Sequence, residues 1–232
     1  MPLGRRRNRI DRSLRERGVP PEPQQRERDV DETTGPWDVT DAPDDGTGRI
    51  DLGSLRVPAV PGMELRVDMN AQQVVGASLR SGDSMLQLAA FAAPRAAGIW
   101  DDVRADLARG AAEQGAELQE VEGPFGPELA GTVLITVAPE PGEPGPGQQV
   151  RQPARFLGVD GPRWFLRGML SGSAAADRDA AAALEQAFAG VVVVRGDEPM
   201  PVREQLPLVL PAQAAEEVAR QQAAAGGAPG AQ

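Results

Sequence analysis

The sequence predicts an α+β fold, a single domain built on a largely antiparallel sheet with two helices packed on it. Short segments alternate apolar and polar residues with the period of two that is typical of strands. Most of these segments are joined by short glycine-containing turns, which indicate hairpins and therefore antiparallel neighbours. Two longer segments place their apolar residues at helical spacing, and we expect both helices on one face of the sheet.

The first half of the domain is predicted to hold four strands and one helix. Strands are expected at 52–57 and 63–69, and a hairpin is expected from strands at 73–80 and 85–92. A helix is expected at 99–114, because Trp100, Val103 and Leu107 form one apolar stripe. Gly115 stands where a C-terminal cap is usual.

The second half repeats this order. Strands are expected at 117–122 and 128–137, followed by a mobile Gly/Pro-rich loop at 139–153. A second hairpin is expected from strands at 155–159 and 163–170, and a second helix at 174–190. Residues 191–211 should be extended, and the prolines at 199, 201 and 207 place them on a sheet edge or across the surface.

The composition of the margins differs from that of the domain at 50–211. Residues 1–35 are predicted to be a disordered Arg/Glu-rich arm, and residues 36–49 an acidic linker. Residues 212–232 are predicted to be a disordered Ala/Gly-rich tail. No apolar run is long enough to cross a bilayer and no secretory signal follows the N-terminal arginines, so we expect a cytoplasmic protein without a membrane partner.

The residue types that are absent exclude much chemistry. The chain has no Cys, His, Tyr or Lys, which leaves no thiolate, no imidazole base or ligand, and no Schiff-base lysine. The acidic run beginning at Asp41 does not fit a calcium loop, because Pro43 and Leu52 fall where ligands are required. We therefore predict no cofactor, no metal and no catalytic residue, and an enzyme is disfavoured without being excluded.

Two features are candidate binding sites. Trp37, a lone large apolar residue among acids, either anchors in the groove of a partner or folds back onto its own domain. Strand alternation places Arg163, Phe165 and Arg167 on one face, where an anion or a base could bind, with Arg155 as a further contributor. The alternative is that these arginines pair with carboxylates or cover the sheet with their stems.

The leading functional hypothesis is a non-enzymatic protein-interaction or regulatory domain with an unknown protein partner. The first alternative is a domain that binds a small anionic ligand or nucleotide on the face of Arg163. The second alternative is nucleic-acid association through the N-terminal arm, since residues 1–28 hold nine Arg against four acids in a chain of net charge −10. The arginines concerned are Arg5, Arg6, Arg7 and Arg9.

Six segments together resemble a known family. They are GPWD at 35–38, DAPDD at 41–45, DLGSLRVP at 51–58, AAPR at 92–95, GVDGPRW at 158–164 and RGDEP at 195–199. In combination they resemble an uncharacterised actinobacterial family, domain of unknown function 3710. The resemblance implies a cytoplasmic single domain of bacterial origin, and no activity, cofactor or catalytic residue. The order of elements also resembles the fold shared by the photosystem II extrinsic protein P and the nuclear import factor Mog1.

Overall fold

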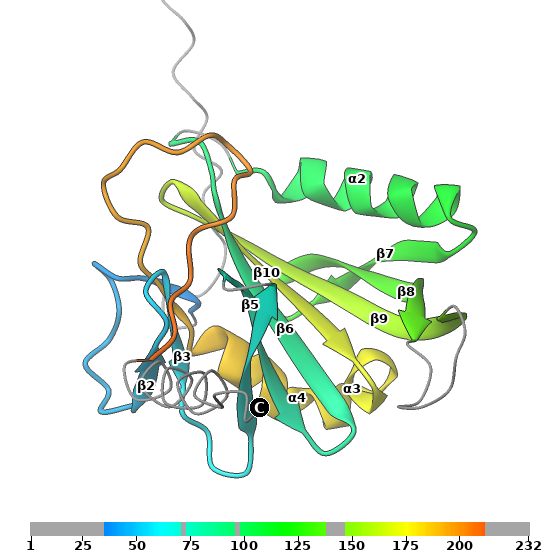
Figure 1. Ribbon diagram of the computed structural model, residues 1–232, viewed down its shortest axis with the longest axis horizontal. Coiled ribbons are helices and arrows are strands. Elements are labelled where there is room, and N and C mark those ends of the chain that lie inside the picture. Colours follow the sequence, from blue (N-terminus) through cyan, green and yellow to red (C-terminus); the bar gives the residue numbers. More distant parts are fainter. Residues whose placement is uncertain (1–34, 71–72, 96–97, 138–146, 212–232) are drawn as a thin grey trace, which may run out of the picture.

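The computed structural model describes residues 35–70, 73–95, 98–137 and 147–211 (Figure 1). It confirms an α+β fold in which antiparallel strand pairs dominate. The arm predicted to be disordered, apart from Gly35, and the tail predicted at 212–232 lie outside the described residues. None of the helices in the described ranges is long and apolar enough to cross a membrane.

A seven-stranded sheet forms the centre of the molecule, in the order β4-β5-β6-β10-β9-β8-β7, and every neighbouring pair in it is antiparallel. The predicted hairpins 73–80/85–92 and 155–159/163–170 are confirmed as β5–β6 and β9–β10. Gly82 has φ +61° in the first of these turns, a conformation that glycine adopts freely. The strands are β4 (Glu64–Asn70), β5 (Gln73–Ser81), β6 (Ser84–Ala92), β7 (Glu117–Gly123), β8 (Gly126–Val137), β9 (Gln148–Gly161) and β10 (Trp164–Ser171).

The prediction of a loop at 139–153 is partly wrong. Residues from Gln148 onward belong to β9 and pair with β8, beginning with Gln148 opposite Val137. The Pro/Gly content of this segment suggested a loop, but Pro153 is accommodated opposite Thr132 in the ladder. Residues 138–146 lie outside the described residues.

A second, four-stranded sheet has the order β1-β11-β3-β2. The segment 36–49, predicted as a linker, contributes to it at both ends: β1 pairs parallel with β11, and Arg49 begins β2. The strands of this sheet are short: β1 (Trp37–Asp38), β2 (Arg49–Asp51), β3 (Leu55–Pro58) and β11 (Val192–Val193).

The helices are α2 (Trp100–Glu113), α3 (Ser173–Ala176) and α4 (Arg178–Ala189). α2 confirms the helix predicted at 99–114. The helix predicted at 174–190 is interrupted at Asp177, which has the extended conformation φ −115°, ψ 122°. Its carboxylate accepts a hydrogen bond from the Asp179 N–H at 2.9 Å, so Asp177 is the N-cap of α4.

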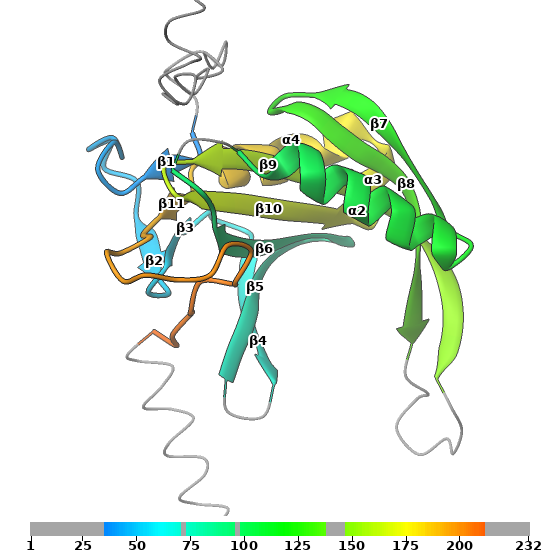
Figure 2. The same ribbon diagram turned by 90° about the horizontal axis from the view of Figure 1, so that it is seen from above.

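The expectation that both helices cover one face of the sheet is wrong. Along β10, Trp164 and Leu166 point into a core shared with Leu184 of α4 and with the small sheet. Phe165, between them, points into a second core with Trp100 of α2. Because adjacent strand residues point to opposite faces, α2 and α4 lie on opposite sides of the large sheet, as Figure 2 also shows. We call the two sides the α2 face and the α4 face.

The closing segment 194–211 runs along the end of β6 that β5 leaves unpaired, and most of its residues are exposed, in agreement with the predicted edge or surface position. β6 pairs with β5 as far as Leu88, and beyond that point it pairs with the closing segment instead. The Ala92 N–H donates to the Glu204 carbonyl, and the Leu206 N–H donates to the Ala90 carbonyl, both at 2.8 Å. Leu206 and Leu208 are buried. Pro199 and Pro201 lie before the paired residues 203–206 and Pro207 follows them, so none of these prolines stands where an N–H pairs with β6.

Candidate functional site

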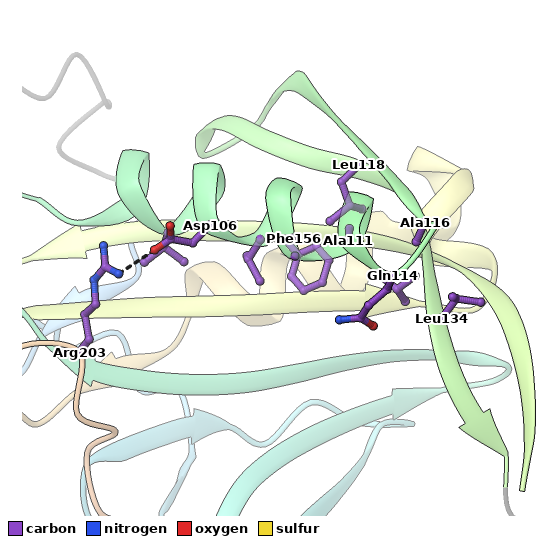
Figure 3. A pocket seen from close by; sticks show the side chains of 12 residues that line it. Asp106, Ala111, Gln114, Ala116, Leu118, Leu134, Phe156 and Arg203 are labelled. Carbon is purple, nitrogen blue, oxygen red and sulfur yellow. Dashed lines mark hydrogen bonds and ion pairs between the residues drawn. The ribbon is translucent and has the colours of Figure 1, made fainter.

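A hollow of about 370 Å³ lies between α2 and the strands β7, β8 and β9, and we call it the α2 groove (Figure 3). Its lining is mainly aliphatic and aromatic. The larger apolar side chains come from four elements: Val103 and Leu107 of α2, Leu118 of β7, Val133 of β8 and Phe156 of β9. Most of these side chains are only partly buried, so the groove is an apolar surface that solvent reaches.

The N-terminal end of α2 is anchored to the C-terminal end of β9. The carboxylate of Asp160 accepts hydrogen bonds from the N–H groups of Ile99 at 2.8 Å and Trp100 at 3.2 Å, which would otherwise be unpaired at a helix start. The indole N–H of Trp100 donates to the Pro127 carbonyl at 2.7 Å. A Cβ on Gly158 would lie 2.3 Å from the Trp100 ring, so only glycine allows this approach. These contacts hold α2 above the sheet.

Polar groups mark the two ends of the α2 groove. At one end Arg203 donates to Asp106 of α2 at 2.7 Å and lies 3.6 Å from Asp102, and this hydrogen bond lowers the pKa of Asp106 below its usual range. The closing segment presents Arg203 in this position because its backbone N–H is bonded to the Ala92 carbonyl of β6. Gln114 lies at the other end (Figure 3).

Beside the groove, aromatic rings and two arginines form a continuous stack on the α2 face. The Phe165 ring lies between those of Trp100 and Phe91, with centroids 5.5 and 6.0 Å away. Arg104 lies over Trp100 at 5.6 Å, and Arg167 lies over Phe91 at 5.4 Å. Phe165 is only 1% exposed, so in this arrangement it supports the face from below.

The structure separates the predicted binding residues Arg163 and Arg167. Arg163 lies in the β9–β10 turn with φ +61°, before β10 begins. Its guanidinium donates to the Gly196 carbonyl and lies 3.8 Å from the Asp197 carboxylate.

Phe91, which the sequence did not single out, takes the place next to Arg167. Phe91 follows an alternating strand pattern, and its register opposite Phe165 depends on a partner strand more than 70 residues away.

Arg155 lies on the α4 face and does not join the others. It is buried, its Nε is 3.7 Å from Glu128 Oε2, and its guanidinium is also paired with Glu185 of α4. Glu128 is fully buried and accepts no hydrogen bond from any residue in the described ranges. Burial raises the pKa of Glu128 to about 7, against the opposing effect of Arg155. Sequence reasoning missed this carboxylate because it resembles an exposed strand residue.

Trp37 folds back onto its own domain. The backbone N–H of Trp37 donates to the Val191 carbonyl at 2.9 Å, and its side chain is half-buried. The neighbouring Asp38 accepts a 2.7 Å hydrogen bond from the indole N–H of the buried Trp164. In the structure the GPWD segment is therefore part of the fold. Among the residues that the structure describes, no group of three or more acidic side chains is placed to hold a metal ion.

A comparison with protein-family models gives a match. A family model described as Protein of unknown function (DUF3710) matches residues 35–217. The matched range begins just before β1 and continues beyond the closing segment, so it contains both sheets, the three helices named above and the α2 groove. It agrees with the resemblance seen in the sequence. The search of curated proteins finds no match.

Proposed function

We propose that this chain, which belongs to the DUF3710 family of proteins of unknown function, is a non-enzymatic protein-interaction domain that binds an apolar segment of a partner in its α2 groove. The proposal keeps the leading hypothesis from the sequence and gives it a location on the domain. We further propose that it acts in the cytoplasm. The α2 groove is the observation on which the proposal depends.

The size and lining of the groove favour side chains over a large cofactor. Ligand pockets generally range from about 300 to 1,000 Å³, and the α2 groove, at about 370 Å³, is at the lower end. Leu107, Leu118 and Leu134 line it and remain partly exposed. A few apolar side chains buried in such a groove are the usual energetic centre of a protein interface.

The charges around the groove favour a basic segment. α2 and β7, which border it, carry seven acidic residues and two arginines. One of the arginines, Arg104, is already paired with Asp101 at 2.7 Å and with Glu120 at 3.4 Å. This excess of negative charge attracts Lys or Arg next to the apolar anchors and repels acidic segments.

The composition supports binding over catalysis. A chain without His, Cys, Lys or Tyr has few groups that can transfer a proton or act as a nucleophile near neutral pH. Glu128, a carboxyl group whose pKa is raised by burial, is enclosed on the α4 face and does not line the groove. These facts support a binding role.

Selection of random peptides on the purified full-length protein tests the proposal. We expect enriched peptides to carry two or more large apolar residues next to Lys or Arg. Leu107→Arg places a charge in the groove and should weaken binding by about tenfold or more, the equivalent of one lost apolar anchor. Val209→Arg is the matched control, because Val209 is 54% exposed and lies outside the groove. Selected peptides that bind Leu107→Arg as well as the unchanged protein would refute the proposal.

A further inference from the structure

Arg167 differs from the other arginines that are largely covered by the fold. Arg104 and Arg155 each contact two carboxylates. Arg167 has no carboxylate within ion-pair distance and no hydrogen-bond partner among the residues that the structure describes, and its guanidinium lies 5.4 Å from the centroid of the Phe91 ring. Burial alone lowers its pKa. A guanidinium with five N–H donors and no protein acceptor is suited to an anion from outside the chain.

Arg167 lies on the same face of the sheet as the α2 groove. The strand register places it opposite Ala89 of β6 and Gly158 of β9, two small residues. Its neighbour along that face, Met169, is opposite Phe156, which lines the groove. Arg167 and Phe156 are therefore diagonal neighbours, about 7–8 Å apart at Cα on such a sheet. The partly exposed Met169 provides an apolar path between them.

This spacing fits the end of an extended peptide. Each extended residue spans about 3.3 Å, so the separation of the Phe156 and Arg167 Cα atoms corresponds to two or three residues of an extended peptide. Arginine binds a carboxylate through two parallel N–H···O bonds. Arg203, the cation at the mouth of the groove, is already bonded to Asp106 and is not available in the same way.

We propose that the α2 groove binds the C-terminal end of a partner protein, with the α-carboxylate held by Arg167. The last apolar side chains lie over Met169 and Phe156, and basic residues before them run toward the acidic border formed by α2 and β7. This inference rests on the function proposed above, because it names the part of the partner that the groove recognises.

The test compares one library of hexapeptides, random at their last four positions, prepared once with free C termini and once as C-terminal amides. Affinity selection on the full-length protein, read by mass spectrometry, measures which members bind. We expect the free acids to bind about tenfold or more tightly than the matching amides, since the amide lacks the charge that Arg167 pairs. Decanoate, an apolar carboxylate without peptide groups, should compete only weakly.

Variants assign this preference to Arg167. Arg167→Gln should remove the difference between acids and amides, and Arg167→Lys should restore part of it. Arg80→Gln, which removes an exposed arginine of β5, should leave the difference unchanged, and thermal unfolding checks that each variant is folded. Acids and amides that bind equally, both weakened by Leu107→Arg, would overturn this inference and leave the interaction domain standing. If neither library binds, the result would count against both the interaction domain and the recognition of a C terminus. If decanoate binds as tightly as the acids, the groove would be assigned to an acyl ligand and the C-terminal peptide would be rejected.

Discussion

The free energy of unfolding should fall as the pH rises from about 5 to about 8, because one buried carboxyl group, Glu128, ionises in that interval. Burial raises its pKa from 4.5 to about 7. Arg155 of β9 and Arg178 of α4 favour the charged form and Glu185 of α4 opposes it, but desolvation has the largest effect. The folded state therefore holds a proton that the unfolded chain has already released.

The size of the effect follows from the shift. Each pKa unit corresponds to 1.36 kcal/mol, so the shift of Glu128 is equivalent to about 3 kcal/mol. This stability is fully present below the unfolded pKa, and it is lost as the pH rises through the folded pKa. Because the chain has no histidine, no side chain with an ordinary pKa titrates in the same interval and obscures the change.

Urea unfolding at half-unit steps of pH, followed by circular dichroism, measures this slope. Glu128→Gln should flatten it, since the amide cannot ionise. Glu120→Gln is the matched control, because Glu120 is an exposed carboxylate whose loss leaves the α4 face unchanged. A stability that rises between pH 5 and 8, or a slope that survives Glu128→Gln, would refute the reasoning.

Two further substitutions test how the groove and the fold are supported. Asp160→Ala removes the acceptor for two N–H groups at the start of α2 and should cost about 1–2 kcal/mol in urea unfolding, with weaker binding of the peptides selected on the groove. An unchanged peptide affinity would show that α2 keeps its position without this cap. Asp38→Ala leaves the Trp164 indole N–H buried without its acceptor and should cost about 1–3 kcal/mol by the same measurement, whereas Asp44→Ala, in the same acidic segment, should have little effect.

Local patterns predicted the hairpins and α2 well, because each depends on residues close together in the chain. The hairpin β5–β6 follows from alternation on either side of a short turn that contains Gly82, and α2 follows from one apolar stripe. The same reasoning failed where the answer depends on distant partners. The side of the sheet that a helix covers depends on the path of the chain between the helix and the strands next to it. β10 carries large apolar residues on both of its faces, so its sequence fits either arrangement.

The candidate site shows the same limit. Strand parity correctly placed Phe165 and Arg167 on one face, opposite Trp164. The ring next to Arg167 comes from β6, and the two carboxylates around Arg155 come from β8 and α4. Nothing in a single strand indicates these partners, because they are set by the register between strands. The α2 groove itself is a property of how a helix rests on three strands.

The change of partner along β6 has a consequence for synthesis on the ribosome. The end of β6 lacks its final neighbour until residues 203–206 have been made, more than 110 positions later. β1 likewise waits for β11, so the earliest and latest strands of the domain complete each other. Because these pairings join residues far apart in the chain, folding cannot be completed until almost the entire domain has emerged. Until then the end of β6 presents an open edge that is prone to association. Translation arrested before residue 203 should therefore yield a chain that needs a chaperone.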